Sequence, residues 1–230
     1  VPDADFVAPM PASGNYAALG FSQGSGLPFE YGVIRNHYVG RTFIQPSPDI
    51  RNLGVRLKLN PVREVLNGKS VIVVDDSIVR GTTLRESIIR ILDRLEPAKI
   101  VIVSSSPQIR YPDCYGIDMA KLGDFIAFKA AIELLKNTGR EDVIRQVNKK
   151  AQAELQKPDI EMVNVVKEIY DRFTYEEISN QIALMLRTPE IKADVEVVYQ
   201  SVDGLHKACP GHTGDWYFTG NYPTPGGNKV

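Results

Sequence analysis

The sequence predicts an α/β protein in which a mostly parallel sheet is flanked by helices and is followed by a helical C-terminal extension. Three apolar runs, each bounded by glycine, proline or charged residues, are too short for helices and are typical of buried parallel strands: Asp5 to Met10, Ser70 to Val74 and Lys99 to Ser104. A helical pattern separates the last two runs, and from about Asp124 helical patterns replace strands altogether. These observations together define the fold class.

The segment from Thr82 to Leu95 has the periodicity of an amphipathic helix. Its large apolar residues recur on one helical face, and its charged residues lie largely elsewhere. With the runs on either side, it predicts one βαβ unit from Ser70 to Ser104. Nearer the start, we expect a helix from Tyr16 to Ser22 and a further strand from Phe29 to Arg35.

The C-terminal part is expected to be helical and then irregular. Thr174, with Glu177 three residues later, is typical of a capping box at the start of the last helix. From Ser201 onward the chain is rich in glycine, proline and aromatic residues and has no regular apolar spacing. The expected helices are Phe125 to Leu135, Glu141 to Leu155, Asn164 to Phe173 and Tyr175 to Arg187.

Composition excludes several classes of protein. A chain of 230 residues with a net charge of -1 carries no basic footprint of the kind that nucleic-acid binders need. Two cysteines are too few for a disulfide framework, and no leader or long apolar run is present. We therefore expect a soluble, cytoplasmic protein with no nucleic-acid or membrane partner. Because Val1 lies just before an apolar stretch, we also expect a fragment of a longer protein.

The most informative segment is VIVVDDSIVRGTT, from Val71 to Thr83. In a parallel sheet, ligands bind at the carboxyl ends of the strands, where Asp75 and Asp76 emerge. The next residues open a helix, so free backbone N–H groups and hydroxyls there can hold a phosphate, and Gly81 permits close approach. Two carboxylates suit vicinal sugar hydroxyls or a bound Mg²⁺. A pair of acids after a strand can also be an ordinary solvated turn.

The whole string resembles the phosphoribosylpyrophosphate (PRPP) signature of type I phosphoribosyltransferases. In that family the two acids hold the ribose hydroxyls, and the loop holds the 5'-phosphate. The segment is not a Walker A loop, and the glycines around Gly20 have the wrong spacing for a dinucleotide fingerprint. The resemblance therefore implies these PRPP-binding residues: Asp75, Asp76, Ser77, Ile78, Val79, Arg80, Gly81, Thr82 and Thr83.

Further strings resemble the glutamine PRPP amidotransferases in particular: RNHYVGRTFIQP, VRLKLN, SSSPQIRYPDCYGIDM and FTGNYPTP. The resemblance implies the type I phosphoribosyltransferase fold, with a core at residues 1–135 and a helical extension and irregular tail at 136–230. It also implies a separate N-terminal glutaminase domain with a catalytic cysteine, which we expect to be absent from this chain.

Residues 35–58 resemble the flexible loop that closes over PRPP in this family. Closure would exclude water from a reactive glycosyl centre. The alternative is a solvated basic hairpin, with Tyr38 and Phe43 packed on the body of the protein. The resemblance implies catalytic roles for Asp75 and Asp76, together with the cations that a departing pyrophosphate needs: Arg35, Arg41 and Lys58.

The first strand ends in PMPASG, where the family has its pyrophosphate loop. Ala12 stands where an acid is usual, so this position departs from the family pattern. Ser13 matches the hydroxyl that the family associates with magnesium, together with Asp75 and Asp76. The resemblance also implies that Ser13 and Gly14, in the pyrophosphate loop, bind PRPP. The resemblance therefore implies Mg²⁺ as the cofactor.

Some members of the family carry an iron–sulfur cluster, but the paired cysteines before FTG are absent here, so we expect no cluster. A mixed zinc site is a weaker alternative to a packed tail. Its ligands would be His206, Cys209, His212 and Cys114.

The implied reaction is displacement of pyrophosphate from PRPP by ammonia, which gives phosphoribosylamine, the first product of purine biosynthesis. Two alternatives stay open: a salvage phosphoribosyltransferase that takes a nucleobase, and a regulatory protein that senses PRPP. The expected partners are PRPP, ammonia and pyrophosphate, purine nucleotides as feedback inhibitors, the missing glutaminase domain, and further copies of the chain in a homo-oligomer.

Overall fold

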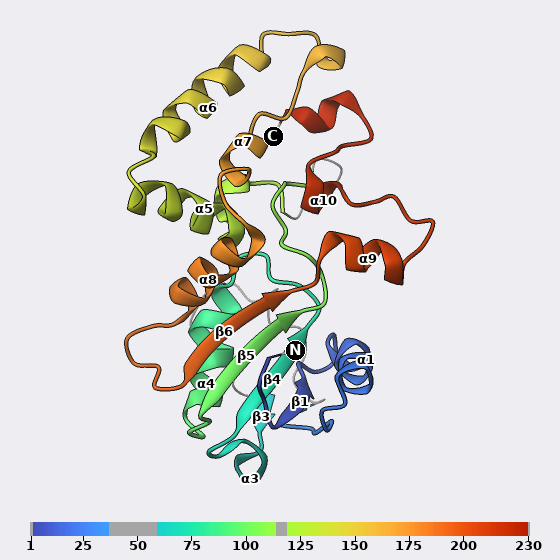
Figure 1. Cartoon of the computed structure of the whole chain (residues 1–230), viewed down its shortest axis with the longest axis vertical. Helices are drawn as coiled ribbons and strands as arrows, with labels where there is room; N and C mark the ends of the chain where they lie inside the picture. Colours follow the sequence, from blue (N-terminus) through green and yellow to red (C-terminus); the bar gives the residue numbers. More distant parts are fainter. Residues whose placement is uncertain (1, 37–58, 114–118, 230) are drawn as a thin grey trace. The chain divides into compact units, whose positions relative to one another are not determined.

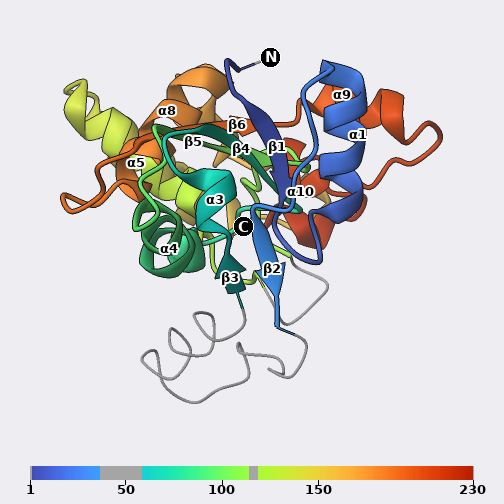
Figure 2. The ribbon, with the colours of Figure 1, turned by 90° about the horizontal axis from the view of Figure 1, so that it is seen from below.

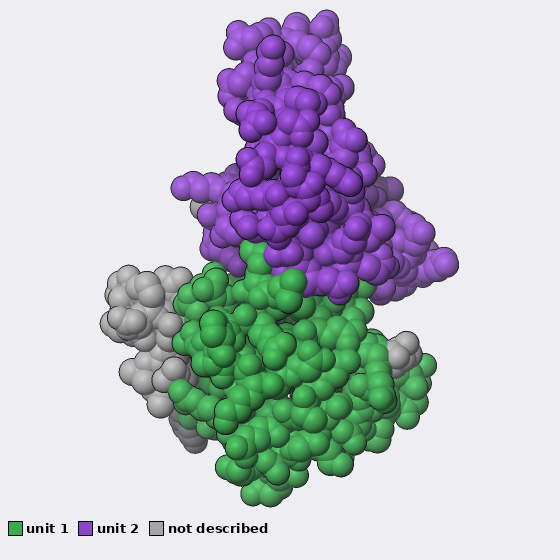
Figure 3. Space-filling model, turned by 60° about the vertical axis from the view of Figure 1, so that its left-hand side comes forward, with its two compact units in different colours: residues 1–77, 81–105, 183–199 green, residues 78–80, 106–182, 200–230 purple. Residues whose placement is uncertain are grey.

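The computed structural model describes residues 2–36, 59–113 and 119–229. Most of the expected closing loop, with Arg41 and Lys58, lies outside the described residues, as does Cys114. The chain forms two compact units, which are coloured separately in Figure 3. Unit 1 comprises Val1–Ser77, Gly81–Ser105 and Ala183–Tyr199, and unit 2 comprises Ile78–Arg80, Ser106–Ile182 and Gln200–Val230.

Unit 1 contains a parallel four-stranded sheet with the strand order β1-β4-β5-β6 (Figure 1). The three predicted strands are confirmed. β6 is a correction, because the sequence analysis placed this segment in a helical extension, whereas it pairs along the full length of β5. The strand bounds are β1 Phe6–Pro9, β4 Ser70–Asp75, β5 Lys99–Ser104 and β6 Asp194–Tyr199.

Both faces of the sheet are covered. Helix α1 (Asn15–Ser25) packs Ala18 against an apolar cluster that includes Val7, Ile72 and Val101. In β4 and β5, consecutive residues are buried although they point to opposite faces of the sheet, as expected for parallel strands between layers. The predicted helix between these strands is confirmed. It consists of a π-helical turn, η2 (Leu84–Ile88), that continues into α4 (Ile89–Asp93).

A separate two-stranded antiparallel pair joins β2 (Val33–Arg35) to β3 (Leu59–Pro61), as Figure 2 shows, and the short helix α3 (Arg63–Leu66) follows. The predicted strand from Phe29 is therefore longer than the observed β2. Phe29 instead makes an isolated bridge to β1, and the backbone N–H of Gly32 donates to the carbonyl of Glu30, which turns the chain before β2 begins.

Unit 2 is built from helices and turns. The predicted helix from Asn164 is wrong in extent, because the Asn164 Oδ1 accepts from the backbone N–H of Val166 and favours a turn there. The tail also contains short helices that the sequence analysis did not predict. The elements are η3 Leu122–Asp124, α5 Ile126–Asn137, α6 Glu141–Glu154, η4 Asp159–Glu161, α7 Lys167–Tyr170, α9 Val202–Ala208, α10 Trp216–Thr219 and η5 Pro225–Asn228.

Helix α8 (Tyr175–Leu186) begins in unit 2 and ends in unit 1. Its predicted capping box is confirmed. The backbone N–H of Glu177 donates to Thr174 Oγ1 over 3.1 Å, and the backbone N–H of Thr174 donates to Glu177 Oε2 over 2.7 Å. Over the described parts of the chain, every helix falls short of the length and apolar character that crossing a membrane requires.

Candidate functional site

The candidate site in unit 1 is centred on the turn that ends β4. Asp75 is the last residue of the strand, and its Oδ1 accepts from the backbone N–H of Asp76 over 2.9 Å. The next backbone N–H, that of Ser77, donates to Asp76 Oδ1 over 2.7 Å. Each carboxylate therefore binds a backbone amide through one oxygen, which fixes the direction in which the group points.

The loop after β1 reaches this turn through a hydroxyl. Ser13 Oγ donates to Asp75 Oδ1 over 3.1 Å, although the two residues are 62 positions apart in the sequence. β1 and β4 are adjacent parallel strands, so their carboxyl ends meet at one edge of the sheet. The structure thus brings together the residues that the sequence analysis grouped as a magnesium site.

Gly14 lets the loop pass directly over β4. A Cβ atom at this position would lie 2.0 Å from the carbonyl oxygen of Val74, which no side chain can tolerate. The same carbonyl accepts from the backbone N–H of Met10 over 2.8 Å, so the loop is tied to the strand on both sides of Ala12. Ala12 itself is exposed and joined to Pro11 by a cis peptide bond.

Asp75 lies in an environment that disfavours its charged form. Burial of its carboxyl group, with the adjacent charge of Asp76, raises the pKa of Asp75 to about 6. The hydrogen bonds from the Asp76 amide and from Ser13 act in the opposite direction but do not cancel the rise. An ionised Asp75 is therefore unfavourable in the free protein, and a cation placed against it would relieve that cost.

The loop after the carboxylates opens η2. Gly81 is buried with a φ of 70°, a left-handed conformation that favours glycine, and its carbonyl accepts from the backbone N–H of Arg85 over 2.9 Å. Thr82 and Thr83 are exposed. Their part in holding a phosphate stays a prediction.

Three residues of the predicted phosphate loop belong to unit 2 and have contacts of their own there. Ile78 is buried, and the Val79 carbonyl accepts from the backbone N–H of Ile126 over 2.9 Å. Arg80 lies 3.6 Å from Asp124, and both side chains are well exposed, so this ion pair is weak. Ile78 is thus packed, and Val79 hydrogen-bonded, by other residues of unit 2.

Arg35 is the one predicted pyrophosphate-binding cation within the described residues. It ends β2, and its Nε atom is buried without a hydrogen-bond partner in the described part of the protein. A buried, unsatisfied donor on the first residue of the expected closing loop is compatible with an anion-binding role.

Sequence reasoning missed Ser105, the first residue after β5. Its Oγ donates to the Asp76 carbonyl over 3.1 Å, and its backbone N–H donates to the Asp75 carbonyl over 2.9 Å. The run of three serines from Ser104 is a signal in the sequence, but only the pairing of β4 with β5 shows which hydroxyl reaches the turn.

The alternative zinc site receives no support from the described residues. His206 Nε2 lies 3.1 Å from Asp215 Oδ2, and Cys209 is an exposed thiol. Across residues 2–36, 59–113 and 119–229, no three His, Cys, Asp or Glu side chains gather as metal ligands would. Cys114 lies outside these ranges.

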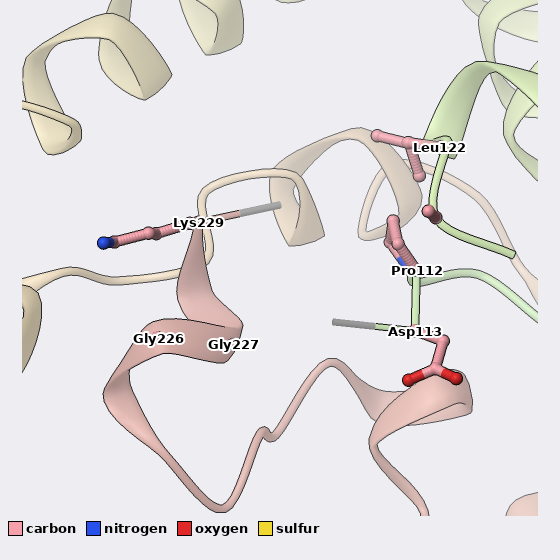
Figure 4. Close-up of a pocket in the computed structure, with 7 residues that line it drawn as sticks. Pro112, Asp113, Leu122, Gly226, Gly227 and Lys229 are labelled. Atoms are coloured by element: carbon pink, nitrogen blue, oxygen red, sulfur yellow. The ribbon is translucent and has the colours of Figure 1, made fainter. Parts of the chain in front are cut away.

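Unit 2 also contains a small open pocket, which Figure 4 shows in close-up. The amino group of Lys229, one of its lining residues, pairs with Asp159 over 2.9 Å. The pocket is lined by Pro112, Asp113, Ala120, Leu122, Gly226, Gly227 and Lys229.

Comparison with known proteins gives similar sequences in the amidophosphoribosyltransferases. That of Synechocystis sp. is 49% identical over 130 residues, which cover 56% of this chain and 26% of the relative. That of Methanocaldococcus jannaschii is 52% identical over 125 residues, covering 54% and 26%. The matched segments thus span about a quarter of the length of these curated relatives. No family model matches the chain.

Among solved structures, the glutamine PRPP amidotransferase of Bacillus subtilis, complexed with ADP and GMP, is similar over nearly the whole chain. It matches with a TM-score of 0.59 and 33% sequence identity over 97% of this chain and 39% of that one. The structure of an allosteric regulatory enzyme of purine biosynthesis matches with a TM-score of 0.58. The predicted fold class and the sequence resemblance to this family are both confirmed.

Proposed function

We propose that this chain is the phosphoribosyl-transfer portion of an amidophosphoribosyltransferase and that it displaces pyrophosphate from PRPP with ammonia. The product is 5-phosphoribosylamine, in the first step of purine biosynthesis. The observation that carries the proposal is the hydrogen-bonded group of Ser13, Asp75 and Asp76 at the carboxyl edge of a parallel sheet. Relatives about half identical in sequence to much of this chain support it.

In the proposed complex, Asp75 and Asp76 accept hydrogen bonds from the two ribose hydroxyls, and the loop from Ser77 to Thr83 holds the 5'-phosphate. Gly14 and Ser13 approach the pyrophosphate. A crowded carboxylate pair with a hydroxyl beside it suits a hard divalent cation, so Ser13, Asp75 and Asp76 fit a Mg²⁺ site. Bound Mg²⁺ would supply positive charge against the pyrophosphate.

The reaction breaks the bond between the anomeric carbon and the pyrophosphate oxygen, and this oxygen keeps the electron pair. The ring gains oxocarbenium character as the bond lengthens, and the negative carboxylates of Asp75 and Asp76 stabilise it. The lone pair of ammonia then forms the new C–N bond, and a proton leaves the nitrogen afterwards. Arg35, Arg41 and Lys58 neutralise the departing pyrophosphate, and a closing loop at 35–58 excludes water.

Several wider expectations belong to the same proposal. The transfer site lies within residues 1–135, and the remainder supplies strand β6 to the sheet as well as the C-terminal extension. The chain works with a glutaminase domain that supplies ammonia, in a cytoplasmic homo-oligomer. Because the Bacillus subtilis structure has ADP and GMP bound, purine nucleotides are proposed as feedback inhibitors.

The test is release of pyrophosphate from Mg-PRPP by the purified chain with ammonium, with purine bases and with no acceptor. Release that depends on ammonium and rises with pH towards the pKa of ammonium supports the proposal, because only unprotonated ammonia carries the attacking lone pair. Release that needs a purine base would instead indicate a salvage enzyme. Binding of PRPP without turnover under all three conditions would indicate a PRPP sensor.

A further inference from the structure

Ser105 stands beside the carboxylate turn because of strand register. Asp75 and Ser104 are the last paired residues of β4 and β5. The next residue of the β5 chain therefore faces the peptide group that follows Asp75. Its backbone N–H continues the ladder by donating to the Asp75 carbonyl, and its hydroxyl donates one residue further, to the Asp76 carbonyl over 3.1 Å.

The carbonyl that Ser105 holds belongs to the Asp76–Ser77 peptide group. A peptide group is planar, so fixing its C=O also fixes the N–H on the opposite side. That N–H is the Ser77 donor to the Asp76 carboxylate over 2.7 Å. A single rigid plane thus links the Ser105 hydroxyl to the direction of the Asp76 side chain.

We propose that Ser105 is a positioning residue that sets the orientation of the Asp76 carboxylate for a phosphorylated pentose. The inference rests on the proposed function. Ser105 does not need to touch the sugar, since it acts through the Asp76–Ser77 peptide. Asp76 is exposed, so packing restrains its carboxylate little and the hydrogen bonds of the turn largely determine its direction.

The hydroxyl can be removed without disturbing the sheet. The backbone N–H of Ser105 pairs with β4 in any non-proline variant, so Ser105→Ala deletes one hydrogen bond and leaves the ladder intact. Ser105→Thr keeps the hydroxyl. Ser25→Ala is the control, because the Ser25 hydroxyl also donates to a carbonyl in unit 1, that of Ser22 at the far end of α1, and accepts from the backbone N–H of Leu27.

The experiment compares wild type with Ser105→Ala, Ser105→Thr and Ser25→Ala in two assays. One measures kcat and KM for ammonium-dependent pyrophosphate release, and the other measures binding of ribose 5-phosphate with Mg²⁺ by calorimetry. Ser105→Ala should lower kcat by about 10- to 100-fold, more than it changes KM, because misdirected carboxylates mainly weaken transition-state contacts. It should also weaken ribose 5-phosphate binding, while the melting temperature falls by no more than a few degrees, as expected for one lost hydrogen bond. Ser105→Thr should recover most of both quantities.

Wild-type values for Ser105→Ala in both assays would overturn the role of Ser105 and leave the proposed function intact. A loss in Ser105→Thr as deep as that in Ser105→Ala would also overturn it, since the hydroxyl would then not be the active feature. If wild type neither binds ribose 5-phosphate nor releases pyrophosphate, the proposed function fails and the inference fails with it.

Discussion

Two charged side chains, one in each unit of the chain, are held in opposite ways. In unit 2, Arg110 is 7% exposed, and its guanidinium lies 3.8 Å from the ring centroid of Tyr175 and 4.9 Å from that of Tyr170. Its Nε and Nη2 atoms both donate to Gln108 Oε1, over 3.1 and 2.7 Å. In unit 1, Asp75 is placed beside a second carboxylate, and its pKa rises to about 6.

The difference separates a structural charge from a functional one. The two rings and the amide oxygen that contact Arg110 all attract a cation. Around Asp75, burial and the charge of Asp76 oppose ionisation in the free protein. An unfavourable charge of this kind is typical of a binding site, where a ligand can stabilise it. A charge that the protein itself stabilises indicates a structural role.

The largest expected effect is on turnover. Asp75→Asn and Asp76→Asn should each lower ammonium-dependent pyrophosphate release by roughly 100-fold or more, because the ribose and the charged transition state lose an anionic partner. Steady-state kinetics with saturating ammonium measure this effect, and circular dichroism checks the fold. Near-wild-type rates in both variants would contradict the ribose-site assignment and the interpretation of Asp75 as a functional charge.

The next effect is on stability. Arg110→Leu should lower the free energy of unfolding by about 2–4 kcal/mol, because the ring contacts are lost and Gln108 Oε1 is left without its donor. Urea denaturation measures this loss. Arg140→Leu is the control, because exposed Arg140 lies 6.0 Å from the ring centroid of Phe173 and should change stability by less than about 0.5 kcal/mol. Equal effects of the two substitutions would deny Arg110 its structural role.

A smaller change of opposite sign is expected at Asp75. In the absence of Mg²⁺ and at neutral pH, Asp75→Asn should raise the free energy of unfolding by about 1–3 kcal/mol. The amide oxygen can still accept from Ser13 and from the Asp76 amide, while the unfavourable charge is removed. Thermal denaturation of the free proteins tests this, and a destabilised variant would show that the Asp75 charge is not in conflict.

The smallest effect is the pH dependence of that difference. The folded pKa of Asp75, about 6, lies above the ordinary aspartate pKa of 3.8, so the folded protein binds more protons between these values. The contribution of Asp75 to stability is therefore full below about pH 4 and is lost as the pH rises through 6, by at most about 1.4 kcal/mol per pH unit. The gap between wild type and Asp75→Asn should shrink on acidification, and a gap constant from pH 4 to 8 would contradict this.

Sequence patterns predicted the elements whose signal is local. β4 and β5 follow from their apolar runs, and the capping box of Thr174 and Glu177 follows from its spacing. β6 was missed because its DVEVVY segment alternates polar and apolar residues, as an edge strand can, and its identity depends on pairing with β5. The role of Ser105 depends on the same kind of information, since register brings it to a residue 29 positions away.

Gly14 has a consequence at the level of the gene. Any base change that replaces a glycine by another amino acid adds a Cβ, and a Cβ here would collide with the Val74 carbonyl at 2.0 Å. We therefore expect no amino-acid substitution to be tolerated at position 14, although glycine has no side chain that could act in the site. Random mutagenesis should recover inactive proteins at this codon as often as at the codons of the two acids. A screen for lost activity would then report Gly14 as essential. The reason would be the absence of a side chain, which lets the loop lie against the Val74 carbonyl.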